Sequence, residues 1–234
     1  MSDKSKSILR FILMALGVFI FQVLFYQLSL VIIQAIAKHM VNTSNDYLLM
    51  IHHTIEFVLV FIPTFIIHRL KKLDFGYHFK EIKKAMLCLA ISSGFGALIS
   101  IISVIDGARY SFSLSSLVFQ LFFSGLGEEI LYRSLPLVLF TLAYGNDTTI
   151  KIGKKISIDF GIIVSALFFS LAHISFQFGY SGISFSYLQL LCSFVCGIIF
   201  GYAYKKTNSI WICMGLHGIY NLIVVSIPMF FSLF

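Results

Sequence analysis

The chain has 234 residues, of which 59% are hydrophobic and only 12% are charged, and its mean hydropathy is +0.94. Soluble domains carry about 45–50% apolar and about 25% charged residues, so this composition excludes a disordered chain, a disulfide-rich secreted domain and an ordinary soluble enzyme. The apolar stretches are continuous rather than alternating, which also excludes a membrane β-barrel. We therefore expect an all-α fold, a polytopic bundle of transmembrane helices.

Seven apolar stretches are long enough to cross a bilayer as a helix, which takes about 20 residues. They are Phe11–Ala37, Leu48–Ile67, Ala85–Ile105, Leu114–Ala143, Phe160–Phe178, Tyr187–Tyr204 and Ile210–Phe231. The fourth is longer than a straight crossing requires, so we expect a tilted, bent or broken helix there. The first is about twice as long as the 7–15-residue apolar region of a signal peptide, so we expect it to be retained as a membrane helix.

Basic residues alternate between the two sides of the predicted spans. The segment before the first span holds three of them, and the loops after the second, fourth and sixth spans hold six, three and two. The loops on the other side hold only Lys38 and Arg109. Because cytoplasmic loops carry an excess of Lys and Arg, we expect a cytoplasmic N-terminus and a C-terminus outside.

The formal net charge of +7 arises largely from these loops. Positive loop ends face the anionic cytoplasmic leaflet of a membrane, so we expect no nucleic-acid partner. All four cysteines fall within the predicted spans, and no disulfide framework is expected. They are Cys88, Cys192, Cys196 and Cys213.

The fourth span contains Glu128, Glu129 and Arg133 near its centre. Each ionisable group costs on the order of 3 kcal/mol at the centre of a membrane helix, so it needs a partner, water or a function. Glu129 and Arg133 are four residues apart and share a helix face, which predicts a structural ion pair. Glu128 points about 100° away, where it is free to exchange protons. Pro136 cannot donate to the carbonyl of Tyr132, which predicts a bend beside this cluster.

Two further spans bring polar groups to a similar depth. The fifth carries His173, with Phe169 one turn earlier on the same face, and the seventh carries His217 and Asn221 on one face. At 1.5 Å per residue, Glu128, His173 and Asn221 lie roughly 16–22 Å from the cytoplasmic ends of their helices. Each histidine alone is also consistent with a hydrogen bond between helices, but the common depth of three helices favours a shared site.

Together these residues resemble the three motifs of the CPBP intramembrane proteases, a family of CAAX-type processing proteases and bacteriocin-processing or immunity (Abi) proteins. The motifs are Glu128-Glu129-x-x-x-Arg133, Phe169-x-x-x-His173 and His217-x-x-x-Asn221. The resemblance covers roughly Leu114 to Phe231. We therefore expect a catalytic helical core over residues 114–234 and three N-terminal membrane helices over residues 1–113.

The resemblance implies hydrolysis of a peptide bond within the membrane. Glu128 and His173 would activate the attacking water. His217 and Asn221 would stabilise the oxyanion of the tetrahedral intermediate, a contribution of roughly 3–4 kcal/mol in other hydrolases. Three residues would support this catalytic group: Glu129, Arg133 and Phe169.

The sequence leaves the question of a metal cofactor open. Glu128, His173 and His217 could hold Zn²⁺ as a His₂Glu set with a fourth position for water. The usual His-Glu-x-x-His zinc motif is absent from the sequence, and Asn221 is a poor zinc ligand but a good hydrogen-bond donor. We expect a glutamate mechanism without a cofactor and keep Zn²⁺ as the alternative.

A second polar group lies in the second span, where His52, His53 and Glu56 fall within about one turn. His52 and Glu56 share a helix face. This spacing predicts a structural pair near the outer interface, and a role in substrate gating is the alternative.

We expect an integral, multi-pass membrane protein whose partners are the lipid bilayer and a peptide or lipidated-protein substrate. The Phe- and Lys-rich usage favours a bacterial cell membrane. The sequence identifies neither the substrate nor the oligomeric state. Two other functions fit the same residues: a non-catalytic bacteriocin immunity protein, and a proton-coupled carrier, because carboxylates and histidines also build proton relays. The inverted repeats of many carriers are absent from the sequence.

Overall fold

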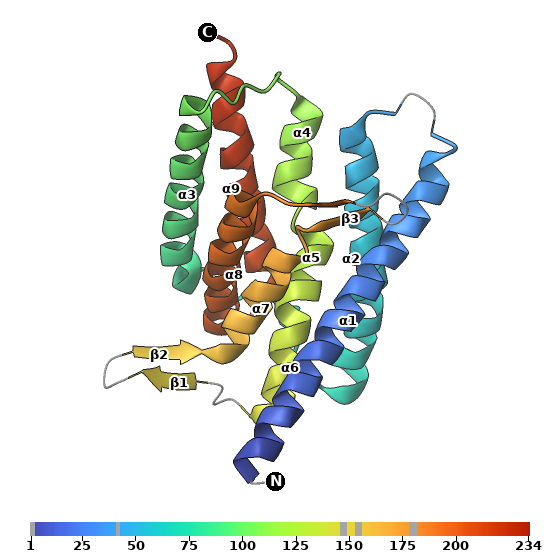
Figure 1. Ribbon diagram of the computed structural model, residues 1–234, viewed down its shortest axis with the longest axis vertical. Coiled ribbons are helices and arrows are strands. Elements are labelled where there is room, and N and C mark those ends of the chain that lie inside the picture. Colours follow the sequence, from blue (N-terminus) through green and yellow to red (C-terminus); the bar gives the residue numbers. More distant parts are fainter. Residues whose placement is uncertain (1–2, 41–42, 146–148, 153–155, 178–181) are drawn as a thin grey trace.

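The structure, a computed structural model, describes residues 3–40, 43–145, 149–152, 156–177 and 182–234. These residues form a bundle of helices with two short β-hairpins (Figure 1). The helices are α1 (Asp3–Ala37), α2 (Asn45–Lys71), α3 (Ile82–Ile105), α4 (Leu114–Val118), α5 (Leu126–Glu129), α6 (Leu135–Tyr144), α7 (Phe160–Leu171), α8 (Tyr187–Thr207) and α9 (Ile210–Phe231). Two π-helical segments are η1 (Phe119–Phe123) and η2 (Ile130–Ser134), and the strands are β1 (Thr149–Ile152), β2 (Ile156–Asp159), β3 (Ser175–Gln177) and β4 (Gly182–Ser184). Lys154, Lys155 and Phe178 lie outside the described residues.

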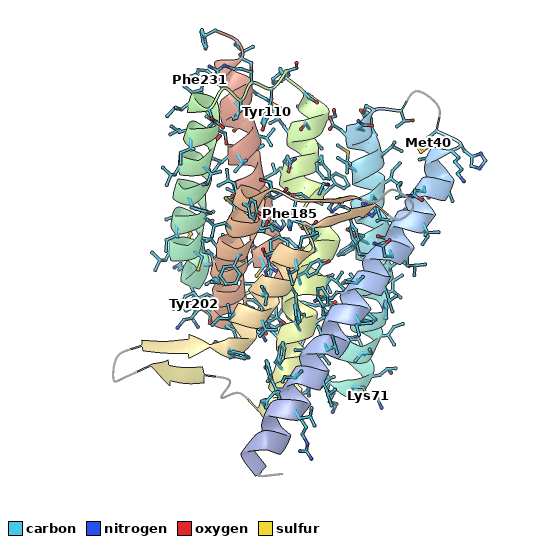
Figure 2. The ribbon with its side chains drawn as sticks, viewed as in Figure 1. Met40, Lys71, Tyr110, Phe185, Tyr202 and Phe231 are labelled. Atoms are coloured by element: carbon cyan, nitrogen blue, oxygen red, sulfur yellow. The ribbon has the colours of Figure 1, made fainter. Side chains whose placement is uncertain are left out.

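Within the described residues, six helical segments are long and apolar enough to cross a membrane. They are α1, α2, α3, the run from α4 to α6, α8 and α9. The expected polytopic helical bundle is thus confirmed. The chain begins at one end of the bundle and finishes at the other (Figure 1), and Lys71 lies towards the first end and Phe231 towards the second (Figure 2). Which end faces the cytoplasm stays a prediction.

The predicted fifth span, Phe160–Phe178, is wrong as a membrane crossing. α7 has only 12 residues, a length of about 18 Å, whereas the hydrocarbon core is about 30 Å thick. The chain leaves the helix after Leu171, turns at His173 and enters the β3–β4 hairpin. The physical reason is a change of pattern, because apolar and polar residues alternate from Ile174 to Gln177, and this period favours a strand.

The long fourth span is broken, as its length led us to expect. η1 and η2 interrupt the α-helical hydrogen bonding on either side of α5. Pro136 has no N–H to offer to the carbonyl of Tyr132. The Ser165 hydroxyl of α7 and the Arg133 guanidinium donate to that carbonyl instead. The hydrogen bond from Ser165 therefore connects α7 to the span that carries the acidic residues.

Two glycines let neighbouring helices approach this span at backbone distance. A Cβ atom at Gly127 would lie 2.6 Å from the Cβ of Glu56, so α2 packs directly on α5. A Cβ atom at Gly218 would clash with the backbone carbonyl of Leu121, so α9 packs directly on η1. Small residues at helix contacts are what permit such close approach in membranes. The two contacts hold α2 and α9 against the segment that contains Glu128.

The Gly218 contact gives a test of this packing. Gly218→Ala is expected to destabilise the protein by about 1–3 kcal/mol, because the added methyl group overpacks a close helix contact. Gly215→Ala on the same helix is the matched control, since nothing lies within 4 Å of its added Cβ. The thermal unfolding midpoints of both variants in detergent measure the difference, and equal midpoints would contradict the contact.

Candidate active site

Four polar side chains from three separate segments line one cavity of about 480 Å³. Glu128 comes from α5, His173 from the turn after α7, and His217 and Asn221 from α9. A second cavity, of about 330 Å³, shares Glu128 and His173 and extends towards α1. Glu128 and His173 therefore lie where the two cavities meet. The structure brings together all four residues that the family resemblance assigned to catalysis.

His217 links the two adjacent acidic residues. Its Nδ1 lies 2.8 Å from Oε1 of Glu129, and its Nε2 lies 3.9 Å from Oε2 of Glu128. A carboxylate accepts hydrogen bonds, so Nδ1 of His217 carries the proton in the shorter contact. This bond fixes the orientation of the imidazole and turns Nε2 towards Glu128. The side chain of Glu128 is 22% exposed, whereas that of Glu129 is fully buried.

Glu129 and Arg133 form an ion pair that is 0% exposed on both sides. The Nε atom of Arg133 lies 3.3 Å from Oε2 of Glu129, and a second guanidinium nitrogen donates to Oε1 at 3.3 Å. The guanidinium carbon lies 4.0 Å from the ring centroid of Phe169, a cation–π contact. The buried cation is thus held by a carboxylate on its own segment and an aromatic face on α7.

The ring of Phe169 also contacts both histidines edge to face. Its centroid lies 4.9 Å from that of His173 and 5.6 Å from that of His217. His173 Nδ1 lies 2.9 Å from the backbone carbonyl of Phe169. A carbonyl only accepts, so Nδ1 carries the proton and Nε2 of the neutral ring is left as an acceptor.

Asn221 is held by residues that sequence reasoning did not single out. Its amide nitrogen donates to the Ser124 hydroxyl at 3.1 Å, and that hydroxyl donates to the backbone carbonyl of Gln120 at 2.7 Å. Ser124 directly follows η1, and both Ser124 and Gln120 line the larger cavity. No spacing in the sequence links Ser124 to Asn221, because the two lie 97 residues apart.

The polar group of α2 lies against this site rather than apart from it. His53 Nδ1 is 4.0 Å from Oε1 of Glu128, and Glu56 packs on Gly127. The expected pair of His52 and Glu56 is present, with 3.8 Å between His52 Nε2 and Glu56 Oε1. Sequence reasoning missed the contact with Glu128 because it depends on how α2 packs against α5.

Zn²⁺ binding by Glu128, His173 and His217 stays an open alternative, because the oxygen contacts of Nδ1 leave Nε2 of each histidine available to a metal. Among the described residues, the one group of three His, Cys, Asp or Glu donors that lie within 4.8 Å of one another is His52, His53 and Glu56. Nδ1 of His173 and Nδ1 of His217 are each engaged by an oxygen acceptor. The arrangement supports acid–base and hydrogen-bonding chemistry at Glu128.

The buried ion pair gives a second test. Arg133→Met is expected to lower the free energy of unfolding by about 3–5 kcal/mol, because Glu129 is left as an uncompensated buried charge. The matched control is Lys84→Met in the exposed pair with Glu81, whose charged atoms lie 3.2 Å apart. That change is expected to cost less than about 1 kcal/mol. Chemical denaturation in detergent measures both free energies of unfolding. Similar losses in the two variants would contradict the claim that burial makes the Glu129–Arg133 pair more costly to break.

Residues 110–223 match the family model described as type II CAAX prenyl endopeptidase Rce1-like. This range contains the four cavity-lining residues Glu128, His173, His217 and Asn221. No curated protein and no solved structure matches the chain. The match agrees with the motif resemblance seen in the sequence. Over residues 110–223, just under half of its length, the chain is similar to the Rce1-like CAAX prenyl endopeptidases, a family of intramembrane proteases.

Proposed function

We propose that the chain is a glutamate-type endopeptidase that hydrolyses a peptide bond in a membrane-associated peptide or lipidated protein, with Glu128 as its general base. The observation that carries this proposal is the cavity lined jointly by Glu128, His173, His217 and Asn221. It contains an acid–base group and hydrogen-bonding groups around one space.

In this proposal, Glu128 and His173 hold the attacking water between them. Glu128 accepts one proton while the water oxygen bonds to the carbonyl carbon of the substrate. His173 accepts a hydrogen bond from the same water through Nε2, because its Nδ1 is committed to the carbonyl of Phe169. When the tetrahedral intermediate collapses, Glu128 returns its proton to the leaving amine nitrogen. A positioned general base of this kind contributes about 10²–10⁴-fold.

His217 and Asn221 stabilise the oxyanion formed on the carbonyl oxygen. His217 donates through Nε2 when its ring carries both protons, and the bond from Nδ1 to Glu129 keeps that atom turned towards Glu128. Asn221 has a second amide hydrogen beside the one given to Ser124. Pre-aimed donors in a cavity shielded from bulk water are worth more than the same donors in water.

The smaller cavity supports a substrate with an apolar part. Its α1 wall carries both apolar and polar side chains, and the lining also includes Glu128 and Tyr132. The apolar residues of that α1 wall are Phe19, Val23 and Leu30. A peptide with a lipid chain can place the chain against α1 and its amide bond beside Glu128. This arrangement supports a prenylated C-terminal peptide as the substrate.

The catalytic proposal is tested by isosteric substitution. Glu128→Gln is expected to reduce the cleavage rate at least roughly 100-fold, because the amide cannot accept the proton of water. The matched control is Glu81→Gln, an exposed carboxylate, which is expected to retain the activity of the unsubstituted protein. Cleavage of a prenylated peptide in proteoliposomes, followed by mass spectrometry, measures both.

Two further variants separate the proposed roles. His173→Ala and Asn221→Ala are each expected to lower the cleavage rate while the unfolding midpoint stays close to that of the unsubstituted protein. Full cleavage by Glu128→Gln would exclude the proposed mechanism. Protection of cells against a bacteriocin by a Glu128→Gln protein that no longer cleaves would favour the non-catalytic immunity function.

A further inference from the structure

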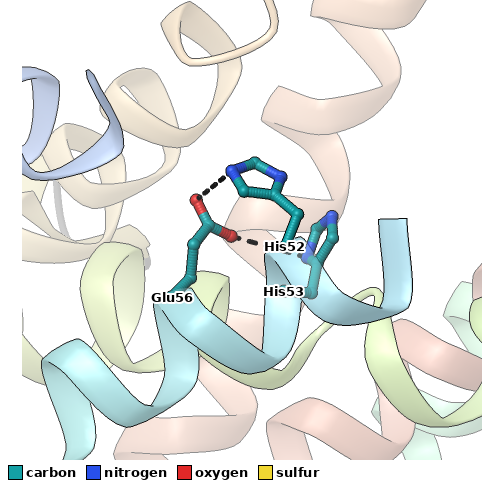
Figure 3. A group of neighbouring side chains, drawn as sticks. All are labelled: His52, His53 and Glu56. Atoms are coloured by element: carbon teal, nitrogen blue, oxygen red, sulfur yellow. Dashed lines mark ion pairs between the residues drawn. The ribbon is translucent and has the colours of Figure 1, made fainter. Parts of the chain in front are cut away.

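His52, His53 and Glu56 form a compact donor group on one turn of α2, and the proposed hydrolysis does not use it (Figure 3). One ligand atom from each side chain lies within 4.8 Å of the others. Oε1 of Glu56 is 3.8 Å from Nε2 of His52, and Oε2 is 3.6 Å from Nδ1 of His53. The carboxylate therefore lies between the two imidazoles.

Two of these donor atoms are buried without a hydrogen-bond partner. They are Nδ1 of His53 and Oε2 of Glu56, which face each other. His53 is 9% exposed and Glu56 is 3% exposed. A buried polar atom without a partner costs about 1–3 kcal/mol, so native proteins rarely leave such atoms unsatisfied. Both atoms point into the space between the donors, where one ligand can satisfy them together.

The charge of the surrounding region points to a cation. Three carboxylates, those of Glu56, Glu128 and Glu129, are buried or half-buried here and are linked to one another through shared histidine contacts. Among the residues in these contacts, the one guanidinium is that of Arg133. With all three carboxylates ionised and the histidines neutral, this region has a formal charge of −2. Uncompensated charge is expensive in a low-dielectric interior. A divalent cation balances this excess.

We propose that His52, His53 and Glu56 bind a divalent transition-metal ion, with Zn²⁺ as the ion that fits best. Two imidazoles and one carboxylate are an established zinc ligand set that leaves a fourth position for water. At zinc–ligand bonds of 2.0–2.2 Å, tetrahedral ligand atoms lie about 3.4 Å apart. The separations of 3.6 and 3.8 Å join the two histidines to different oxygens of Glu56, so side-chain rotations are needed to bring one oxygen to both. Hard ions such as Mg²⁺ prefer sites made of oxygen alone.

α1 supplies the outer hydrogen-bonding group of this metal site. The Ser29 hydroxyl lies 3.3 Å from Oε1 of Glu56, a contact that an ion bound through Oε2 leaves in place, and 3.0 Å from Nε2 of His52, a contact that an ion bound at Nε2 displaces. Hydrogen bonds to ligand side chains orient them in metal sites. Glu56 lines the smaller cavity and His53 lines the larger one, so an ion has a path to the donors.

Zinc content tests the metal site without reference to cleavage. The full chain is purified in detergent, equilibrated with Zn²⁺, freed of unbound ion and analysed for metal and protein. About one ion per chain is expected for a site of this type. Co²⁺ loading gives a second readout, because tetrahedral Co²⁺ with imidazole and carboxylate ligands has a characteristic visible absorption.

Variants on α2 locate the ion. His52→Ala and Glu56→Gln are expected to weaken Zn²⁺ binding by more than the roughly 10–100-fold that loss of an outer hydrogen-bonding partner costs. Ser29→Ala removes that outer partner and is expected to lower affinity within this range. Glu56→Gln keeps the size of the side chain, so it stays informative even where His52→Ala does not fold. His39→Ala, an exposed histidine after α1, is the matched control and is expected to bind Zn²⁺ normally.

Substitutions in the candidate active site separate the two proposals. Glu128→Gln and His217→Gln are expected to lose cleavage and to keep their zinc. Loss of zinc from these variants, with zinc retained by Glu56→Gln, would overturn the α2 site and assign the ion to the catalytic group. Zinc at or below the level bound by a chain that lacks both His52 and Glu56 would also overturn it. Neither result depends on whether Glu128 is the general base.

Discussion

The buried carboxylate of Glu129 is the point to which the whole candidate active site is anchored. It pairs with Arg133 on its own segment and accepts a hydrogen bond from His217 on α9. The Arg133 guanidinium lies on the ring of Phe169, and that ring contacts His173. A single buried charge therefore fixes the relative positions of three elements. A low-dielectric interior makes such contacts strong and their loss costly, so they hold in place the histidines next to Glu128.

The helices of the fold could be predicted from sequence because the lipid environment requires them. Backbone groups in a bilayer have to be satisfied within the chain, so long apolar stretches become helices whose bounds follow from composition. The prediction failed at α7, where apolar residues continue past Leu171 but the helix does not. A hydrophobicity average does not distinguish a helix from an apolar hairpin. The alternation after His173 contained that information, although it covers only a few residues.

Contacts within one helix of the candidate site could be predicted from the sequence, but contacts between helices could not. Spacing of three or four residues indicates a shared helix face, which was enough to pair Glu129 with Arg133. The bond from His217 to Glu129 spans 88 positions, and that from Asn221 to Ser124 spans 97. Such contacts depend on how helices pack. The approach of His53 to Glu128 likewise follows from the absence of a side chain at Gly127.

The early end of α7 has a consequence for the supply of water. A full-length helix would have continued past His173, whereas the chain turns there and places His173 in the lining of both cavities. Within a membrane, irregular backbone is tolerated where protein covers it or where it borders a hydrated space. Hydrolysis consumes one molecule of solvent for each bond that is cut. The truncated helix thus places the turn that carries His173 beside two cavities, where a hydrolase within a membrane would need its second reactant.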